Sequence, residues 1–227
     1  DLHSFPTRRS SDLSFEKDNM SEDNYEDTID VLGMLDGNLQ KVGEHGVNTT
    51  RTLKAMEEML KDRTGGVVEM DLTAVFKQDE EMVGKYYANE IAQYHIATKF
   101  NYPDSGVLVH GNPDQLSKTF MSMIGNAIYA IVKKAQRKPY EAVLSLDATV
   151  ADGMVSIVIR DNGIGIEEKI LDKIFDPFFT TKTTGEASGI GLYLSHDVIQ
   201  NYGGNITVES VKDEYTQFTI TLPTITE

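Results

Sequence analysis

One apolar repeat constrains the fold of this chain more than any other feature. From Leu32 to Leu60, apolar or small residues recur at spacings of three and four, the period of a coiled-coil helix. The repeat is weak at Gly46 and Thr49, and a glycine inside a helix costs about 1 kcal/mol relative to alanine. Such a helix needs an antiparallel neighbour or a second subunit, unless it lies as an ordinary amphipathic helix on a globular domain. The seam comprises Leu32, Leu35, Leu39, Val42, Gly46, Thr49, Leu53, Met56 and Leu60, and Thr64–Gly66 is predicted to end the helix.

Length, charge and composition limit the kinds of function that this chain can have. The chain has 227 residues, 40% of them hydrophobic, which suits one core with a helical appendage. A formal charge of -15 argues against a nucleic-acid partner. The absence of cysteine excludes disulfides and thiolate metal sites, and the cytoplasm is the expected compartment. No stretch reaches the roughly 18 apolar residues of a membrane helix, so any membrane anchor of the intact protein is expected in missing upstream segments.

The first 13 residues are interpreted as an artefact. DLHSFPTRRSSDL has no apolar period, and it matches the translation of a sequencing-adapter string residue by residue. Residues 1–13 are therefore left out of the fold prediction, and the gene fragment is expected to begin near Ser14.

The remaining pattern predicts an α+β fold in two layers, with a mixed sheet and helices on one face. Asn112 is predicted to cap a helix that has Pro113 in its first turn. The predicted strands are 67–72, a hairpin of 97–102 with 106–110, a second hairpin around residues 144–148 and 155–159, and a closing pair, 206–209 and 217–222. The predicted helices are 73–88, 112–136 and 189–201.

Four segments carry the chemistry, and the first lies on the long predicted helix. Ser122, Asn126, Tyr129 and Lys133 are spaced by four and three, so they form one polar stripe. An asparagine oxygen is a suitable neutral ligand for Mg²⁺. A structural amide is the alternative interpretation of Asn126.

The second segment, Asp161–Ile166, directly follows a predicted strand. A carboxylate there can accept a hydrogen bond from an exocyclic amine such as that of adenine, and its glycines let the backbone approach a flat ring. An ordinary Asp-Asn-Gly turn is the alternative.

The third and fourth segments are predicted to hold phosphate. The third, Ile174–Lys182, contains three phenylalanines, expected to pack against the core at the base of a lid, followed by Thr180, Thr181 and Lys182 near phosphate. The fourth, Gly185–Leu192, opens a helix whose free N–H groups and dipole favour an anion. It is not a P-loop, because no Gly-Lys-Thr or Gly-Lys-Ser ends it.

In this order and spacing, the four segments resemble the N, first glycine, F and second glycine boxes of histidine kinases in the gyrase, histidine kinase and MutL ATPase superfamily. The resemblance covers about residues 71–223. It implies a Bergerat-type ATP site with Asn126 on Mg²⁺ and Asp161 on adenine. It also implies that residues 14–65 are part of a dimerisation and phosphoacceptor region and that 66–227 are the catalytic domain. The predicted catalytic residues are Asn126 and Lys182, and the predicted cofactor-binding residues are Asn126, Tyr129, Lys133, Asp161, Gly163, Gly165, Ile166, Phe178, Thr181, Ser188, Gly189, Gly191, Leu192 and Thr216.

Several positions depart from the family pattern. Ser122 stands where these kinases usually carry a second asparagine, and it cannot abstract a proton from water at neutral pH. Ala187 and Ile190 replace a usual glycine and leucine, and residues 215–218 lack a usual glycine. These changes put tight lid closure in doubt.

The resemblance implies transfer of the γ-phosphoryl group of MgATP to a histidine, in a homodimer that signals to a response regulator. The acceptor is expected on a preceding helix missing from this fragment, because His45 is followed by Gly46 instead of an acidic residue. His45 is instead interpreted as a solvated surface residue. Two alternatives stay open: a catalytically degenerate nucleotide-binding module, which Ser122 and Ala187 favour, and a protein-serine kinase of the anti-sigma type, which the heptad helix disfavours.

Overall fold

The computed structural model describes residues 21–62, 66–104, 106–182 and 187–225. The proposed artefact at residues 1–13 lies outside this range. Residues 64 and 65, part of the segment predicted to end the heptad helix, also lie outside it. The last described residue of that helix is Asp62.

The predicted long helix is confirmed as α2, Glu22–Asp62, which starts ten residues before the apolar repeat. Leu35, Leu39 and Val42 of its seam are 52%, 68% and 67% exposed. An apolar stripe of this kind gains stability only when another surface covers it, so the expected partner stays a prediction. The structure places His45 within α2, but its side chain lies outside the description. Within the described ranges, no helix is both long enough and apolar enough to cross a membrane.

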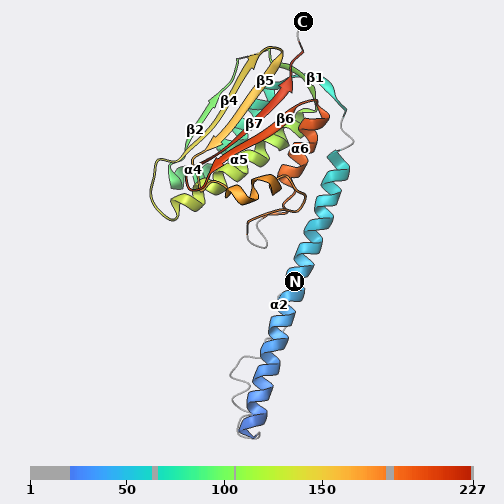
Figure 1. Cartoon of the computed structure of the whole chain (residues 1–227), viewed down its shortest axis with the longest axis vertical. Coiled ribbons are helices and arrows are strands. Elements are labelled where there is room, and N and C mark those ends of the chain that lie inside the picture. The colour runs from blue at the N-terminus through green and yellow to red at the C-terminus, as the bar shows by residue number, and fades with distance from the viewer. Residues whose placement is uncertain (1–20, 63–65, 105, 183–186, 226–227) are drawn as a thin grey trace. The chain divides into compact units, whose positions relative to one another are not determined.

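A five-stranded mixed sheet forms one layer of the body that follows (Figure 1), in the order β2-β4-β5-β7-β6. β2 runs parallel to β4, and the other neighbouring pairs are antiparallel. The predicted hairpins around 152–153 and 213 are both present, and the α+β class is confirmed. The strands are β2 (Ala97–Asn101), β4 (Val143–Ala151), β5 (Met154–Asp161), β6 (Asn205–Val211) and β7 (Tyr215–Pro223).

The predicted hairpin of residues 97–102 and 106–110 is wrong. β3 (Leu108–Gly111) pairs antiparallel with β1 (Val68–Asp71) in a separate two-stranded sheet, whereas β2 joins the large sheet. The alternation of a strand specifies which face is buried but not which strand pairs with it. Here the Leu72 N–H bonds the Val107 carbonyl, which ties the segment after residue 106 to the start of α3.

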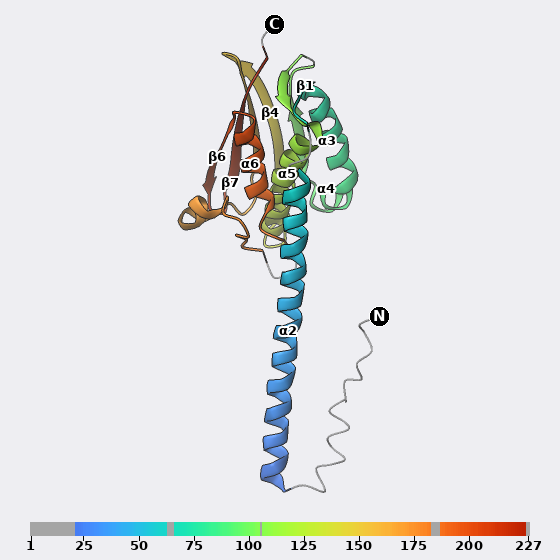
Figure 2. The same ribbon diagram turned by 90° about the vertical axis from the view of Figure 1, so that its right-hand side faces the viewer.

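Among the described residues after β1, four α-helices complete the fold, and α5 and α6 lie against one face of the large sheet (Figure 2). The Asn112 side chain caps α5 as predicted, accepting from the N–H groups of Asp114 and Gln115 at 3.0 and 3.2 Å. The helix predicted for 73–88 ends at Tyr86, and a second helix, which the sequence analysis missed, follows Tyr87. The helices are α3 (Leu72–Tyr86), α4 (Ala88–Tyr94), α5 (Pro113–Ala135) and α6 (Gly191–Asn201).

The core fills the space between the sheet and α5. Alternate residues of each central strand point inward, and the apolar face of α5 meets them. The other face of α5 carries the polar stripe predicted from Ser122 to Lys133, which is only partly buried. The core includes Phe120, Ile124, Ala127 and Ile131 of α5 and Leu144, Leu146, Ile157, Ile159, Phe218 and Ile220 of the sheet.

One acidic side chain is fully buried between α3 and α5. Asp79 is 0% exposed, and its Oδ1 accepts a 2.5 Å hydrogen bond from the Ser117 hydroxyl. Its Oδ2 has no partner among the described residues. Burial raises the pKa of the Asp79 carboxyl to about 7, against the lowering effect of the Ser117 bond. The folded protein therefore holds this proton over a pH range in which the unfolded chain has lost it.

Asp79→Asn should weaken the pH dependence of stability. In the wild type, the contribution of Asp79 is fully present below its unfolded pKa and is lost as pH rises through about 7. We expect wild-type unfolding free energy to fall by on the order of 2 kcal/mol more than that of Asp79→Asn between pH 5 and pH 7. Urea titrations at each pH measure this. Asp152→Asn, at an exposed turn, should keep the wild-type dependence, and an equally steep fall in Asp79→Asn would contradict the assignment.

Candidate functional site

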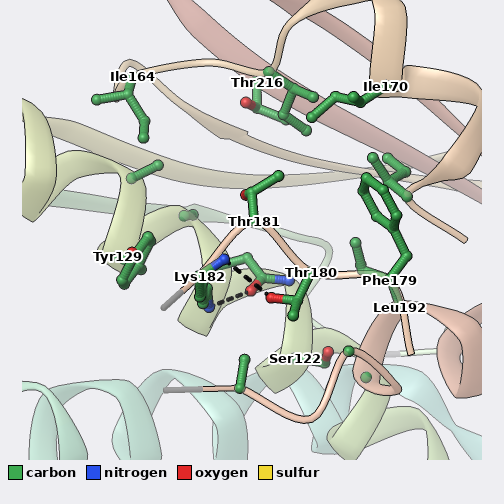
Figure 3. Close-up of a pocket in the computed structure, with 18 of the residues that line it drawn as sticks. Ser122, Tyr129, Ile164, Ile170, Phe179, Thr180, Thr181, Lys182, Leu192 and Thr216 are labelled. Atoms are coloured by element: carbon green, nitrogen blue, oxygen red, sulfur yellow. Dashed lines mark hydrogen bonds between the residues drawn. The ribbon is translucent and has the colours of Figure 1, made fainter. Parts of the chain in front are cut away.

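A cavity of about 440 Å³ lies beside the polar face of α5. Figure 3 shows Ile164 and Thr216 on one side of it, Ser122 on the opposite side, and Thr180, Thr181 and Lys182 between them. All four predicted segments contribute to this single cavity, so Asn126 and Asp161 share it as the sequence analysis required. Its predicted lining residues are Asn126, Tyr129, Asp161, Gly165, Ile166, Thr181, Lys182, Ser188, Gly189, Gly191, Leu192 and Thr216.

Asp161 ends β5 at one side of the cavity and is only 3% exposed. Its Oδ1 accepts a 2.8 Å hydrogen bond from the Gly163 N–H. Burial raises the pKa of this carboxyl to about 7, while the Gly163 bond and the charges of Lys134 and Arg160 act in the opposite direction. A buried acceptor of this kind favours a ligand that brings its own N–H donor.

The loop after Asp161 is held on two sides. The Ile164 N–H bonds the Ala130 carbonyl of α5 at 3.2 Å, and the Ile166 N–H bonds the Ser210 hydroxyl of β6 at 2.8 Å. Between these bonds Gly165 has φ +63°, and an added Cβ would lie 2.2 Å from the Val211 carbonyl oxygen. Both the conformation and the close approach require glycine there.

The opposite side of the cavity carries the polar groups of α5 and the lid segment. The Lys182 ammonium donates a 2.8 Å hydrogen bond to Asn126 Oδ1 and lies 4.4 Å from the centroid of the Tyr129 ring. The Lys182 N–H also bonds the Thr180 hydroxyl at 3.1 Å. Both bonds are drawn in Figure 3. Asn126 therefore directs an oxygen into the cavity, where it binds a positive charge.

The side-chain oxygens at this end of the cavity fit a magnesium ion that takes most of its ligands from a bound substrate. Asn126 Oδ1 already accepts from a cation, and the Ser122 hydroxyl lines the same end of the cavity. The described residues contain no cluster of three or more His, Cys, Asp or Glu side chains suited to a metal. Mg²⁺ commonly takes few protein ligands and completes its shell with phosphate and water.

The start of α6 supplies a further group of donors. Gly191 and Leu192 line the cavity, and the N-cap residue Ile190 forms no side-chain cap. The first N–H groups of the helix are therefore available to an anion. An added Cβ at Gly191 would lie 2.5 Å from the Ser122 Oγ, so the absence of a side chain lets α6 approach α5 at this point.

Three predicted residues do not line the cavity. Lys133 lies beside the Tyr129 ring, 5.1 Å from its centroid, and Gly163 packs against Ala130 of α5. Phe178 is 44% exposed with φ +66°, although it was expected to pack against the core. Phe175 and Phe179 do pack there, so that expectation holds for two of the three phenylalanines.

Several apolar residues of the cavity wall were not predicted from the sequence. Ile170 and Ile174 belong to a segment taken as loop, which contains the 3-10 helix Glu168–Lys173. Their spacing of four was a usable signal for one buried face. Phe218 was assigned to a strand, but only the fold places it under the cavity. The lining residues outside the predicted binding set are Ala127, Ala130, Ile164, Ile170, Ile174, Phe179, Ala187 and Phe218, together with Ser122 of the predicted polar stripe and Thr180, which was predicted to lie near phosphate.

A family profile described as histidine kinase-, DNA gyrase B-, and HSP90-like ATPase matches residues 111–226. These residues make up about half of the chain and contain all four segments of the cavity. The chain belongs to this family. The predicted resemblance to histidine kinase ATP-binding domains is thereby confirmed, and the family is one of ATPases.

Curated relatives of this chain are named as two-component sensors and sensor histidine kinases. The two-component sensor PprA of Pseudomonas aeruginosa is 34% identical over 133 residues, which cover 59% of this chain and 14% of PprA. The sensor histidine kinase ZraS of Escherichia coli (strain K12) is 27% identical over 184 residues, covering 81% of this chain and 37% of ZraS. The chain thus spans well under half of either relative.

Solved structures share the fold of this ATPase domain. The catalytic domain of histidine kinase ThkA has a TM-score of 0.57 and 22% identity, covering 70% of this chain and 96% of that one. The mycobacterial sensor histidine kinase MprB has a TM-score of 0.58 and 21% identity, covering 71% and 100%. Full-length ShkA, solved with AMPPNP, has a TM-score of 0.61 and 17% identity, covering 84% and 38%.

Gly165→Ala should destabilise the domain more than an alanine at another left-handed glycine. Gly153 also has positive φ, +72°, but has open space around it, whereas Gly165 faces the Val211 carbonyl. We expect a loss of about 1 kcal/mol for Gly153→Ala from conformation alone and about 2 to 4 kcal/mol for Gly165→Ala. Chemical unfolding compares the two, and equal losses would show that the close contact relaxes without cost.

Proposed function

We propose that this chain is the catalytic portion of a sensor histidine kinase, which binds MgATP and transfers the γ-phosphoryl group to a histidine. The observation that carries the proposal is the shared cavity, with a buried carboxylate at one side and an amide oxygen paired with a lysine at the other. Family membership supports it, as do one relative named as a two-component sensor and another named as a sensor histidine kinase.

At the side of the cavity that contains Asp161, here called the base side, this carboxylate accepts a hydrogen bond from the exocyclic amine of adenine. Its Oδ1 is already held by the Gly163 N–H, which fixes the orientation of the carboxyl group. Apolar residues, including Ile164 and Ile166, then pack on the faces of the purine. Guanine would present an oxygen to the carboxylate at the corresponding position, so this arrangement favours adenine.

At the phosphate side, Asn126 would hold Mg²⁺ through Oδ1. When bound, the ion would neutralise negative charge on the triphosphate. Lys182 donates a hydrogen bond to the same Oδ1. Its ammonium would shift to a phosphate oxygen when Mg²⁺ binds that Oδ1. The first N–H groups of α6 bind further oxygens of the triphosphate.

The transfer itself requires little covalent chemistry from the protein. The bond from the γ-phosphorus to the bridging oxygen breaks, a bond to an imidazole nitrogen forms, and ADP leaves. Such a loose transition state depends on positioning and charge neutralisation. Ser122 lines the cavity one helical turn before Asn126, and a serine hydroxyl is not a base that activates water at neutral pH. Transfer to a histidine is therefore favoured over hydrolysis.

The intact protein is proposed to be a homodimer that passes the phosphoryl group to a response-regulator receiver domain. The exposed apolar seam of α2 supports dimerisation, because a second copy would cover it. In this proposal residues 14–65 belong to the dimerisation region, residues 66–227 form the catalytic domain, and the acceptor histidine lies outside this chain.

Asp161→Asn should weaken ATP binding at least tenfold, because the buried carboxylate is replaced by a group that also presents donors. Titration calorimetry with ATP and Mg²⁺ measures the affinity. Asp152→Asn, an equivalent change at an exposed turn where φ of +52° suits asparagine, should bind like the wild type. Unchanged affinity in Asp161→Asn would exclude the proposed mode of base recognition.

Incubation with γ-labelled ATP should leave no acid-labile phosphate on this chain. His45 is followed by Gly46 instead of an acidic residue, and we propose that it is not the acceptor. The measurement is radiolabel retained after neutral and acid washes, with His45→Ala as the matched variant. Acid-labile label that disappears in His45→Ala would overturn this prediction, and a wild type that binds no ATP would instead favour a degenerate module.

A further inference from the structure

A buried lysine lies behind the base side of the cavity. Lys134, near the end of α5, is 9% exposed and does not line the cavity. Its ammonium donates to the Asn162 carbonyl at 2.7 Å and to the Glu214 carbonyl at 3.4 Å. It also lies 4.8 Å from the centroid of the Tyr140 ring. Burying an ammonium group is costly unless such partners replace water, so this placement requires all three contacts.

The two carbonyls belong to the two segments that form the base side. Asn162 directly follows Asp161, and Glu214 lies in the turn between β6 and β7, two residues before the lining residue Thr216. A backbone bond of 2.7 Å from the Asp213 N–H to the Ile164 carbonyl joins the same segments. Lys134 thus ties both of them to α5 from a single point.

Titratable groups approach Asp161 from three directions, and two of them, Lys134 and Arg160, are charged at neutral pH. Lys134 approaches from α5, Arg160 from the same strand, and Tyr140 from the loop after α5. Arg160 is exposed and is also engaged by the Gln217 side chain at 2.8 Å and the Tyr215 ring at 3.9 Å. A buried charge is screened less than an exposed one, so Lys134 is the stronger influence on the carboxylate.

Resting on the function proposed above, we propose that Lys134 is a positioning residue for adenine recognition, which holds the Asn162 and Glu214 carbonyls in place and favours the ionised form of Asp161, the form that accepts a hydrogen bond from the purine amine. The lysine does not touch the nucleotide. It acts through the two segments that it joins and through its charge.

The test compares Lys134→Met with Lys138→Met, which removes an exposed lysine just beyond the end of the same helix. The first readout needs no ATP: carbon NMR follows the titration of the Asp161 carboxyl in the ligand-free protein. We expect its midpoint to rise by about half to one pH unit in Lys134→Met and to stay unchanged in Lys138→Met. An unchanged midpoint in folded Lys134→Met would overturn the proposal.

The second readout is affinity for ATP with Mg²⁺ between pH 6 and pH 8.5. We expect Lys134→Met to bind about tenfold more weakly at pH 7 and to recover part of this loss as pH rises, because Asp161 then ionises. An equal loss at every pH would indicate a purely structural role and would overturn the proposal. If Lys134→Met does not fold, Lys134→Gln keeps one donor for the carbonyls while removing the charge, and the same shift of the Asp161 midpoint is expected.

If the wild-type protein binds no ATP, the proposed function is wrong. The Asp161 titration would still decide whether Lys134 lowers the pKa of that carboxyl. The two failures are therefore distinguishable.

Discussion

The site depends on a carboxylate that the fold buries at the end of a central strand. Asp161 is 3% exposed, and a charge in that position is stable only if nearby groups replace water. The Gly163 N–H supplies one hydrogen bond, and Lys134 supplies a nearby positive charge. The remaining acceptor capacity is left for a ligand. Because the buried Asp161 carboxylate has little contact with water, it favours a ligand that carries an N–H donor.

Helix α5 relates the two sides of this site to each other. Its apolar face packs on the sheet, which fixes the rotation of the helix and turns the opposite face toward the cavity. Asn126 and Lys134 are about two turns apart on that helix, so one rigid element places both the amide at the proposed phosphate side and the lysine at the proposed base side. The Lys182 bond to Asn126 then links the lid segment to the same helix.

Much of this arrangement could be predicted because it is encoded locally. The Asn112 cap, the polar stripe of α5 and the two hairpins of the large sheet depend on neighbouring residues and short turns. The pairing of β3 with β1 was missed, because alternation in a strand does not identify its partner. Phe178 was placed in the site and Phe179 was not, because adjacent residues differ in direction by a backbone angle that composition does not specify.

The sequence by itself determined the family, the four cavity segments and the residues proposed to bind a purine and a cation, because these follow from residue type, order and spacing. The contacts between residues that are distant in the chain were decided only by the tertiary structure. It brought Lys134 under the Asn162 and Glu214 carbonyls, which are 28 and 80 residues away along the chain. It also set Lys182 against Asn126 across 56 residues. Contacts of that range arise from the packing of whole elements, and no local pattern specifies them.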